Sequence, residues 1–358
     1  MKITIALPAH YNSPVGGYLV QYRYANLLQA RGHQVTIVFP RSLQVRTELK
    51  ERLKAPLWAL KTRLKNRPLL GSFKLHDGVR VRLLPDLSGG SLPRADVLIA
   101  TAWQTAEAMQ SAPGACGRKY YVVYDYEFFM TEPPEIRERM RRTYLMAYGI
   151  VSTSAAVAEM IRDCGGTPAA HIPCGLDFAE FGMDVAPDQR QPLTLGFPAR
   201  RTPFKGAADA IEAAGRLRAR FGERLRVTAF GIQPLELPDW IQWLQYPSQL
   251  ALRRFYNQNA VFLLPSHYEG WGLPGVEAMA CGAALVVTDN GGSRDYAIDE
   301  ETALVVPPRR PDLMAAAVAR LFDDTPLRLR LARQGHQYVQ RYTWDDAADR
   351  LEALLRGA

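Results

Sequence analysis

Short apolar runs alternate with longer amphipathic stretches along almost the whole chain. Residues 2–7 and 34–39 form two such runs, and residues 18–30 between them carry apolar side chains on one helical face. Short, continuous apolar runs are typical of strands buried in a parallel sheet, and a one-sided stretch is typical of a helix packed on that sheet. These residues therefore predict one βαβ unit.

The alternation continues on both sides of a single break. Before the break we predict strands at 79–84, 96–101, 120–124 and 149–152, and a helix at 155–163. After it we predict strands at 193–197, 225–230, 260–264, 284–288 and 303–306, and helices at 206–221, 249–258, 274–281, 311–322 and 345–355. The polar, proline-containing residues 171–191 interrupt the pattern and indicate a domain boundary.

This pattern predicts an α/β protein with two Rossmann-like parallel-sheet domains in series. We assign residues 1–175 to the first domain, 176–340 to the second, and 341–358 to a C-terminal helical segment. A chain of 358 residues, 47% of them hydrophobic, is long enough to bury two cores.

The start of the chain and the cysteines indicate the compartment. The apolar run at residues 3–7 is too short for a secretory leader and far below the roughly 20 residues that cross a bilayer. The cysteines, which show neither zinc-ligand nor disulfide spacing, are Cys116, Cys164, Cys174 and Cys281. We therefore expect reduced thiols and a cytoplasmic protein.

Positive charge is concentrated in one segment. The net charge is +8, and residues 41–82 alone hold twelve Lys and Arg against three acidic residues. Because the charge is confined to this stretch, we expect a local docking surface and no nucleic-acid partner.

Part of this segment has the pattern of a basic amphipathic helix. Leucines recur at helical spacing between residues 49 and 64, and the polar face and its tryptophan are Lys50, Arg52, Lys54, Trp58, Lys61, Arg63 and Lys65. Such a helix is typical of a segment that contacts an anionic membrane surface. Two alternatives stay open: the leucines pack on the domain's own sheet while the cations face water, or the cations bind an anionic glycan.

The strongest candidate for chemistry is residues 266–277, with the sequence Ser-His-Tyr-Glu-Gly-Trp-Gly-Leu-Pro-Gly-Val-Glu. Here a strand ends, a glycine-rich loop follows, and Pro274 suits the first residue of a helix that Gly282 ends. The loop therefore lies at the carboxyl edge of a parallel sheet, where N–H groups at a helix start can hold a diphosphate without a metal. Glu269 on the loop can accept hydrogen bonds from sugar hydroxyls, and Glu277 on the helix from a ribose diol.

With these residues the sequence resembles glycosyltransferase family 4, whose signature is two glutamates separated by seven residues around a Gly-[Phe/Trp]-Gly-Leu-Pro core. Further matches run along the chain at residues 16–17, 31–35, 172–177, 200–206, 277–282 and 342–344. The resemblance implies a GT-B fold, with two domains facing each other across a cleft and a C-terminal helix crossing back to the first domain. It also implies metal-independent transfer, with retention of anomeric configuration, from a nucleotide-diphospho-sugar.

The resemblance implies roles for individual residues as well. Arg200 and Lys205 match the family's two cations that bind the donor diphosphate, with Arg201 as a rival for the first, and Glu269 matches the sugar ligand. The remaining donor-binding set is Gly16, Gly17, Gly270, Trp271, Gly272, Leu273, Pro274 and Glu277. The alternatives without function are a solvated basic loop at residues 200–205 and a plain tight turn at residues 16–17.

The acceptor side departs from the family pattern. Where relatives commonly carry a histidine after the strand at 120–124, this chain has Asp125-Tyr126-Glu127. Asp125 or Glu127 can accept the hydrogen bond of an acceptor hydroxyl or support positive charge that develops on the sugar. The alternative is that these carboxylates cap a turn or a helix.

We predict a glycosyltransferase that moves a hexose to a hydroxyl of a glycan or lipid-linked acceptor, as in cell-envelope polysaccharide or glycolipid synthesis, at the inner face of the plasma membrane. We expect no cofactor and no metal, because the histidines and acidic pairs lack metal-ligand spacing. The alternative is a catalytically idle homologue that acts as a scaffold in a membrane glycan assembly. The intact Glu269, Glu277, Arg200 and Lys205 argue against that alternative, and the missing histidine keeps it open.

Overall fold

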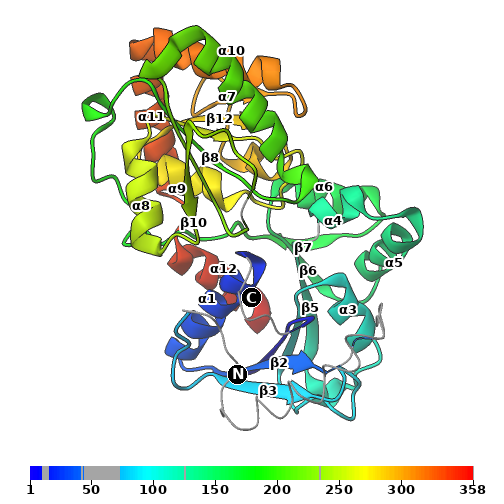
Figure 1. The fold of residues 1–358 in the computed structure, drawn as a ribbon. Coiled ribbons are helices and arrows are strands. Elements are labelled where there is room, and N and C mark those ends of the chain that lie inside the picture. Colours follow the sequence, from blue (N-terminus) through cyan, green and yellow to red (C-terminus); the bar gives the residue numbers. More distant parts are fainter. Residues whose placement is uncertain (10–15, 42, 44–72, 125, 234, 358) are drawn as a thin grey trace. The chain divides into compact units, whose positions relative to one another are not determined.

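The structure is a computed structural model that describes residues 1–9, 16–41, 43, 73–124, 126–233 and 235–357 (Figure 1). The chain divides into two compact units. Unit 1 comprises Met1–Thr153, Val157–Cys174 and Trp344–Ala358, and unit 2 comprises Ser154–Ala156 and Gly175–Thr343. The chain thus passes into unit 2 at Gly175 and returns to unit 1 at Trp344, close to the boundaries that we placed after residues 175 and 340.

Unit 1 is built on a seven-stranded parallel sheet with the strand order β3-β2-β1-β4-β5-β6-β7. Its strands are β1 (Lys2–Ala6), β2 (Gln34–Pro40), β3 (Arg80–Leu84), β4 (Val97–Ala100), β5 (Arg118–Val123), β6 (Gly149–Ser152) and β7 (Pro168–His171). Its helices are α1 (Gly16–Ala30), α3 (Trp103–Met109), α4 (Tyr126–Thr131), α5 (Pro134–Tyr144), most of α6 (Ala155–Asp163) and α12 (Trp344–Arg356). The expected first βαβ unit is β1, α1 and β2.

Helices cover both faces of this sheet (Figure 1). On one face, α3, α5 and α6 enclose a core that includes Ala6, Val38, Leu98, Tyr121, Met140 and Ile161. On the other face, α1 packs against β2 and α12. Burial of both sheet faces explains why the strands read as continuous apolar runs in the sequence.

The C-terminal helix α12 belongs to unit 1. Leu355 is fully buried there, and the Trp344 ring meets the Tyr24 ring of α1 edge to face, with 5.5 Å between centroids. Glu352 of α12 lies 3.0 Å from the Nε2 atom of His33, which follows α1 in the chain. These contacts attach the last helix to the first.

Unit 2 contains a six-stranded parallel sheet with the order β10-β9-β8-β11-β12-β13. Its strands are β8 (Thr194–Pro198), β9 (Arg226–Gly231), β10 (Ile241–Gln245), β11 (Val261–Leu264), β12 (Ala284–Thr288) and β13 (Leu304–Val306). Its helices are α7 (Ala207–Phe221), α8 (Gln249–Gln258), α9 (Leu273–Ala280), α10 (Pro311–Asp323) and α11 (Thr325–Val339). The predicted pair of parallel-sheet α/β domains is confirmed.

Two expectations about helix starts are corrected. Helix α1 begins at Gly16 rather than Tyr18, so Gly16 and Gly17 lie in its first turn and not in a turn before it. Helix α9 begins at Leu273, which makes Pro274 its second residue. Proline is tolerated at the first and at the second position of a helix, because the N–H groups there have no partner within the helix.

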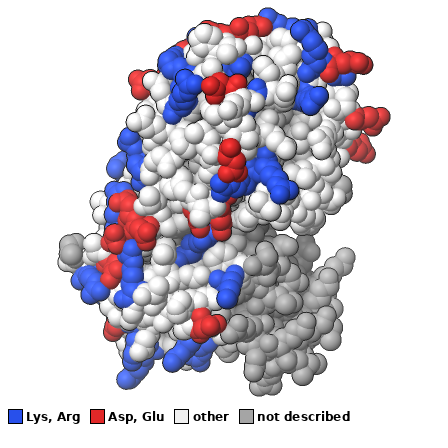
Figure 2. Space-filling model, turned by 90° about the vertical axis from the view of Figure 1, so that its left-hand side faces the viewer, with Lys and Arg blue, Asp and Glu red and all other residues white. Residues whose placement is uncertain are grey.

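Charged residues of both signs share the face of the described chain that Figure 2 shows. On the face shown in Figure 2, Lys and Arg are interspersed with Asp and Glu. Most of the basic segment 41–82 lies outside the described residues. Among those that the structure does describe, no helix has the length and the apolar character that a membrane crossing requires.

Candidate functional site

The candidate site lies at the carboxyl edge of the unit 2 sheet. Strands β8 and β11 are neighbours in that sheet and run parallel. The loop with Arg200 and Lys205 follows β8, and the loop with Glu269 follows β11, so both loops emerge at the same edge. Ligands of open parallel sheets bind at this edge.

Lys205 and Glu269 form a buried ion pair between these two loops. Each residue is only 9% exposed, and the Nζ atom of Lys205 lies 2.8 Å from Oε2 of Glu269. The hydroxyl of Ser266 donates a 2.7 Å hydrogen bond to the other carboxylate oxygen. The structure therefore brings together a residue that we expected to hold the sugar and one that we expected to hold the diphosphate.

The surroundings of Glu269 favour its charged form. Burial by itself raises the pKa of this carboxyl, but the charge and hydrogen bond of Lys205, with smaller contributions from Ser266 and Arg200, outweigh it and leave the pKa lowered. Glu269 is therefore a carboxylate at neutral pH, and its negative charge is compensated by a fixed cation.

Backbone contacts hold the Glu269 loop in place. The N–H of Glu269 donates to the carbonyl of Asn290 at 3.0 Å. A Cβ atom at Gly292 would lie 2.6 Å from the carbonyl oxygen of Glu269 and 2.7 Å from the nitrogen of Trp271, so only glycine permits this approach. The loop is thus packed directly on the segment that follows β12.

A second set of contacts joins the two loops to each other. The N–H of His267 donates to the carbonyl of Phe204 at 2.7 Å, and the Nε2 atom of His267 lies 2.7 Å from an oxygen of Asp209 in α7. These bonds fix Lys205, which lies between Phe204 and α7 in the chain, beside the Glu269 loop.

The start of α9 is shaped by glycine and tyrosine. Gly272 precedes the helix with a φ of +81°, a conformation that favours glycine, and its carbonyl accepts a 2.8 Å hydrogen bond from the hydroxyl of Tyr296. The Trp271 ring is 4% exposed and stands edge to face against Tyr296 and Tyr342. At the other end, Gly282 follows the helix with a φ of +82°, as expected for its stop signal.

Glu277 has a different partner from Glu269. It lies one turn into α9 and is half-buried, and its Oε2 atom accepts a 2.7 Å hydrogen bond from the hydroxyl of Tyr256 in α8. Burial raises the pKa of Glu277 to about 7, although Tyr256 and the charge of Arg200 both act in the opposite direction. This carboxyl therefore changes its charge close to neutral pH.

Arg200 is the accessible cation of the site. Its side chain is exposed, and within the described chain no carboxylate lies at ion-pair distance from it. Its charge lowers the pKa of both Glu269 and Glu277. An exposed guanidinium is suited to bind an oxyanion.

The residues expected from the first domain are placed only in part. Glu127 lies in the first turn of α4, where a carboxylate also stabilises the helix start, and is half-buried. In α1, a Cβ atom at Gly17 would meet no atom of the described residues within 4 Å. Asp125 and the basic-helix residues Lys50, Arg52, Lys54, Trp58, Lys61, Arg63 and Lys65 lie outside the described residues.

Sequence reasoning missed three residues that support the site. Tyr256 donates a hydrogen bond to Glu277, and Tyr296 donates one to the carbonyl of Gly272 at the start of α9. Ser266 donates one to Glu269. Ser266 lies in the recognised motif, three residues before Glu269, so its place in the sequence was a usable signal.

Over the described ranges, no group of three or more His, Cys, Asp and Glu side chains could hold a metal ion. Independence from metals stays a prediction.

Comparisons with known proteins match part of the chain to glycosyltransferases. Residues 184–338, which lie within unit 2, match the family model "Glycosyl transferases group 1". The D-inositol 3-phosphate glycosyltransferase of Jonesia denitrificans is 29% identical over 178 residues, which are 48% of this chain and 39% of that relative. The chain thus spans about two fifths of the length of this relative.

Two solved structures resemble the whole chain. Sucrose-phosphate synthase from Thermosynechococcus elongatus has a TM-score of 0.73 and 17% identity, and the match covers 100% of this chain and 98% of that one. Anabaena HepE in complex with UDP-glucose has a TM-score of 0.73 and 16% identity, with 100% of both chains covered. At such identities the likeness shows the fold alone, and the GT-B fold expected from the sequence is confirmed.

Proposed function

We propose that this chain is a family 4 glycosyltransferase that moves a hexose, with retention and without a metal, from a UDP-sugar to a hydroxyl of a glycan or lipid-linked acceptor. The observation that carries the proposal is the buried Lys205–Glu269 pair beside the start of α9, with Glu277 one turn further on. Burying an ion pair costs several kcal/mol of desolvation, which is readily explained when the charges serve a ligand.

The neighbours support the choice of nucleotide. HepE is described in complexes with UDP, with UDP and glucose, and with UDP-glucose. In this chain, Arg200, Lys205 and the start of α9 would hold the diphosphate, and Glu277 the ribose. Glu269 would hold hydroxyls of the sugar.

The same residues can stabilise the departing phosphate. As the bond between the anomeric carbon and the phosphate oxygen breaks, negative charge grows on the diphosphate, and the cations of Arg200 and Lys205 bind it more strongly than in the ground state. The acceptor oxygen forms the new bond on the face from which the phosphate leaves, and its proton passes to that phosphate oxygen. Glu269, as a carboxylate, stabilises the positive charge of the sugar ring.

The decisive experiment combines binding and turnover. UDP, GDP, dTDP and CDP are compared by thermal shift, and UDP-glucose is then tested for hydrolysis and transfer, with and without EDTA. We expect the largest shift with UDP, turnover that EDTA does not change, and loss of at least about 100-fold in turnover in Glu269→Ala. Glu212→Ala, on the exposed side of α7, is the control and should retain full activity.

Other outcomes separate the alternatives. A protein that binds nucleotide-sugars but turns none over would be the idle scaffold. Loss of turnover in EDTA would contradict independence from metals. Binding to liposomes with anionic lipid at low salt, and its absence with neutral lipid, would support a peripheral position at the membrane.

A further inference from the structure

We propose that Tyr256 is a positioning residue for Glu277, holding one oxygen of its carboxylate so that the other is presented to the ribose hydroxyls of the donor. This inference rests on the proposed function, because it takes Glu277 as the ribose ligand. It adds a residue from α8, outside the recognised loop-and-helix motif.

The contact divides the carboxylate into a held and an open oxygen. The hydroxyl of Tyr256 donates to Oε2 of Glu277 at 2.7 Å. Within the described chain, Oε1 has no hydrogen-bond partner, and it is not among the buried polar atoms that lack one, so it keeps contact with solvent. A carboxylate oxygen in this state can accept hydrogen bonds from an incoming diol.

The Tyr256 ring cannot easily turn away. It is fully buried, and aromatic rings surround it, with centroids 5.2 Å away at Phe262, 5.4 Å at Phe255 and 6.0 Å at Phe230. Rotation of the phenol would have to displace these rings from a close-packed core. The direction of its hydroxyl is therefore fixed by packing.

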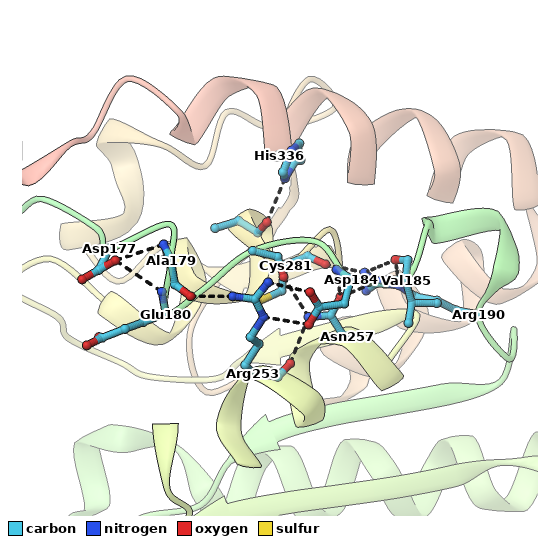
Figure 3. Close-up of polar contacts among 12 residues, drawn as sticks. Asp177, Ala179, Glu180, Asp184, Val185, Arg190, Arg253, Asn257, Cys281 and His336 are labelled. Atoms are coloured by element: carbon cyan, nitrogen blue, oxygen red, sulfur yellow. Dashed lines mark hydrogen bonds and ion pairs between the residues drawn. The ribbon is translucent and has the colours of Figure 1, made fainter. Parts of the chain in front are cut away.

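The backbones of α8 and α9 are joined as well. Arg190 is 5% exposed, and its guanidinium donates to the carbonyls of Tyr256 at 3.2 Å and Asn259 at 3.0 Å, at the end of α8. It also donates to the carbonyl of Cys281, at the end of α9 (Figure 3). A cation suits both helix ends, because their last carbonyls carry partial negative charge. Burial lowers the pKa of Arg190 only to about 10, so it stays charged at neutral pH.

Tyr256 and Glu277 are therefore linked at two points. Their side chains bond directly, and their backbones are connected through Arg190 and Cys281, whose N–H donates to the carbonyl of Glu277 at 3.0 Å. The two attachments hold the last turn of α8 against the middle and the end of α9. Without the hydrogen bond from Tyr256, the carboxylate would be free to rotate.

The hydrogen bond also affects the charge of Glu277. Burial raises the pKa of Glu277 to about 7, and the bond from Tyr256 opposes this rise. Burial and the nearby carboxylate of Glu277 raise the pKa of Tyr256 well above its usual value, so the phenol remains the donor. Without the hydroxyl, more of Glu277 would be neutral at pH 7, and a neutral carboxyl is a weaker acceptor for ribose.

The test compares UDP with 2′-deoxy-UDP, which lacks one hydroxyl of the diol. Calorimetry gives the Kd of each ligand between pH 6 and pH 9 for the wild type, Tyr256→Phe and Glu277→Gln. We expect the wild type to prefer UDP by about tenfold at pH 7, as for a hydrogen bond to a charged group. Tyr256→Phe should reduce the preference to about threefold at pH 7 and keep it below the wild-type value at pH 9, because Glu277 is then ionised but its carboxylate is no longer held.

Two further variants guard against a purely structural effect. Tyr148→Phe removes a hydroxyl that donates to the carbonyl of Ala106 at 2.7 Å in unit 1, and it should keep the wild-type preference at every pH. Tyr256→Met, which fills the same space with a flexible apolar side chain, should repeat the loss of preference if Tyr256→Phe folds poorly.

Three outcomes would contradict the proposal. If Tyr256→Phe keeps both the preference for UDP and the wild-type pH profile, Tyr256 does not position Glu277. If Glu277→Gln keeps the preference, Glu277 is not the ribose ligand, and the positioning role is overturned with it. If the wild type binds neither UDP nor any other nucleoside diphosphate, the proposed function itself is wrong.

Discussion

Glu269 and Glu277 lie on one short segment, yet their surroundings differ in kind. Glu269 is paired with the ammonium group of Lys205, and its pKa is lowered. Glu277 is paired with the neutral phenol of Tyr256, and its pKa is raised to about 7. Both carboxyls are desolvated, so the charge of the partner decides the outcome. One glutamate is a permanent anion, and the other responds to neutral pH.

The largest expected effect comes from removing the cation beside Glu269. Lys205→Met leaves an ionised carboxylate buried without its partner, and we expect a loss of about 3–5 kcal/mol in the free energy of unfolding. Lys205→Met combined with Glu269→Gln should recover most of this loss, because no buried charge remains. Urea denaturation of the wild type and both variants at pH 7 measures the difference.

An exposed ion pair provides the matched control. Arg216 and Glu212 lie 2.8 Å apart on the surface of α7, each about half exposed. Arg216→Met should cost no more than about 0.5 kcal/mol, because solvent screens the pair. A loss below about 1 kcal/mol in Lys205→Met would mean that Glu269 does not depend on a fixed cation, and the comparison would fail.

The second effect concerns Glu277 and has a definite sign. Its pKa is higher in the folded chain than the ordinary value of 4.5, so the folded protein holds a proton that the unfolded chain releases between about pH 4.5 and 7. Its contribution to stability therefore falls as the pH rises through this window. As the pH rises from 4 to 8, the free energy of unfolding of Glu277→Gln should increase by up to about 3 kcal/mol relative to that of the wild type. Urea denaturation at each pH measures this difference.

Glu269 should show the opposite slope. A lowered pKa contributes stability that is present above the unfolded value and is lost as the pH falls through the folded value. Glu269→Gln should therefore have a lower free energy of unfolding than the wild type at pH 7. The difference between the two proteins in urea denaturation should be smaller at pH 3. Slopes of the same sign for both glutamate variants would show that the two surroundings are equivalent.

The fold could be predicted where periodicity is strong. Helices α6 and α8 have the predicted bounds, and most strands differ from prediction by one or two residues, because buried parallel strands are short apolar runs. Strand β7 was missed because Pro168–His171 contains no apolar run, and it lies at the edge of its sheet. Helix α11 was missed because arginines alternate with the leucines at its start.

The site could be predicted only at the level of its motif. The order of strand, glycine loop and helix placed Glu269 and Glu277 at the carboxyl edge of unit 2, where the structure has them. The pairing of Glu277 with Tyr256 depends on the approach of α8 to α9, and no local pattern encodes that distance. In the sequence, Tyr256 has the pattern of any residue on the apolar face of an amphipathic helix.

The smallest effect tests whether the two surroundings are linked through the first turn of α9. A Cβ atom at Gly275 would lie 2.5 Å from the hydroxyl oxygen of the buried Tyr296, which itself binds the carbonyl of Gly272. Gly275→Ala must therefore shift either Tyr296 or the helix start. We expect the free energy of unfolding to fall by about 1–3 kcal/mol. UDP affinity should fall with it, as calorimetry would show.

Gly215 in α7 is the matched control for this substitution. A Cβ atom there would meet no other atom within 4 Å, so Gly215→Ala should stabilise the protein by about 0.5–1 kcal/mol through helix propensity alone. If Gly275→Ala were equally stabilising, α9 would have room to move at its start. Glu269 and Glu277 would then respond to independent surroundings, with no rigid turn to keep their spacing fixed.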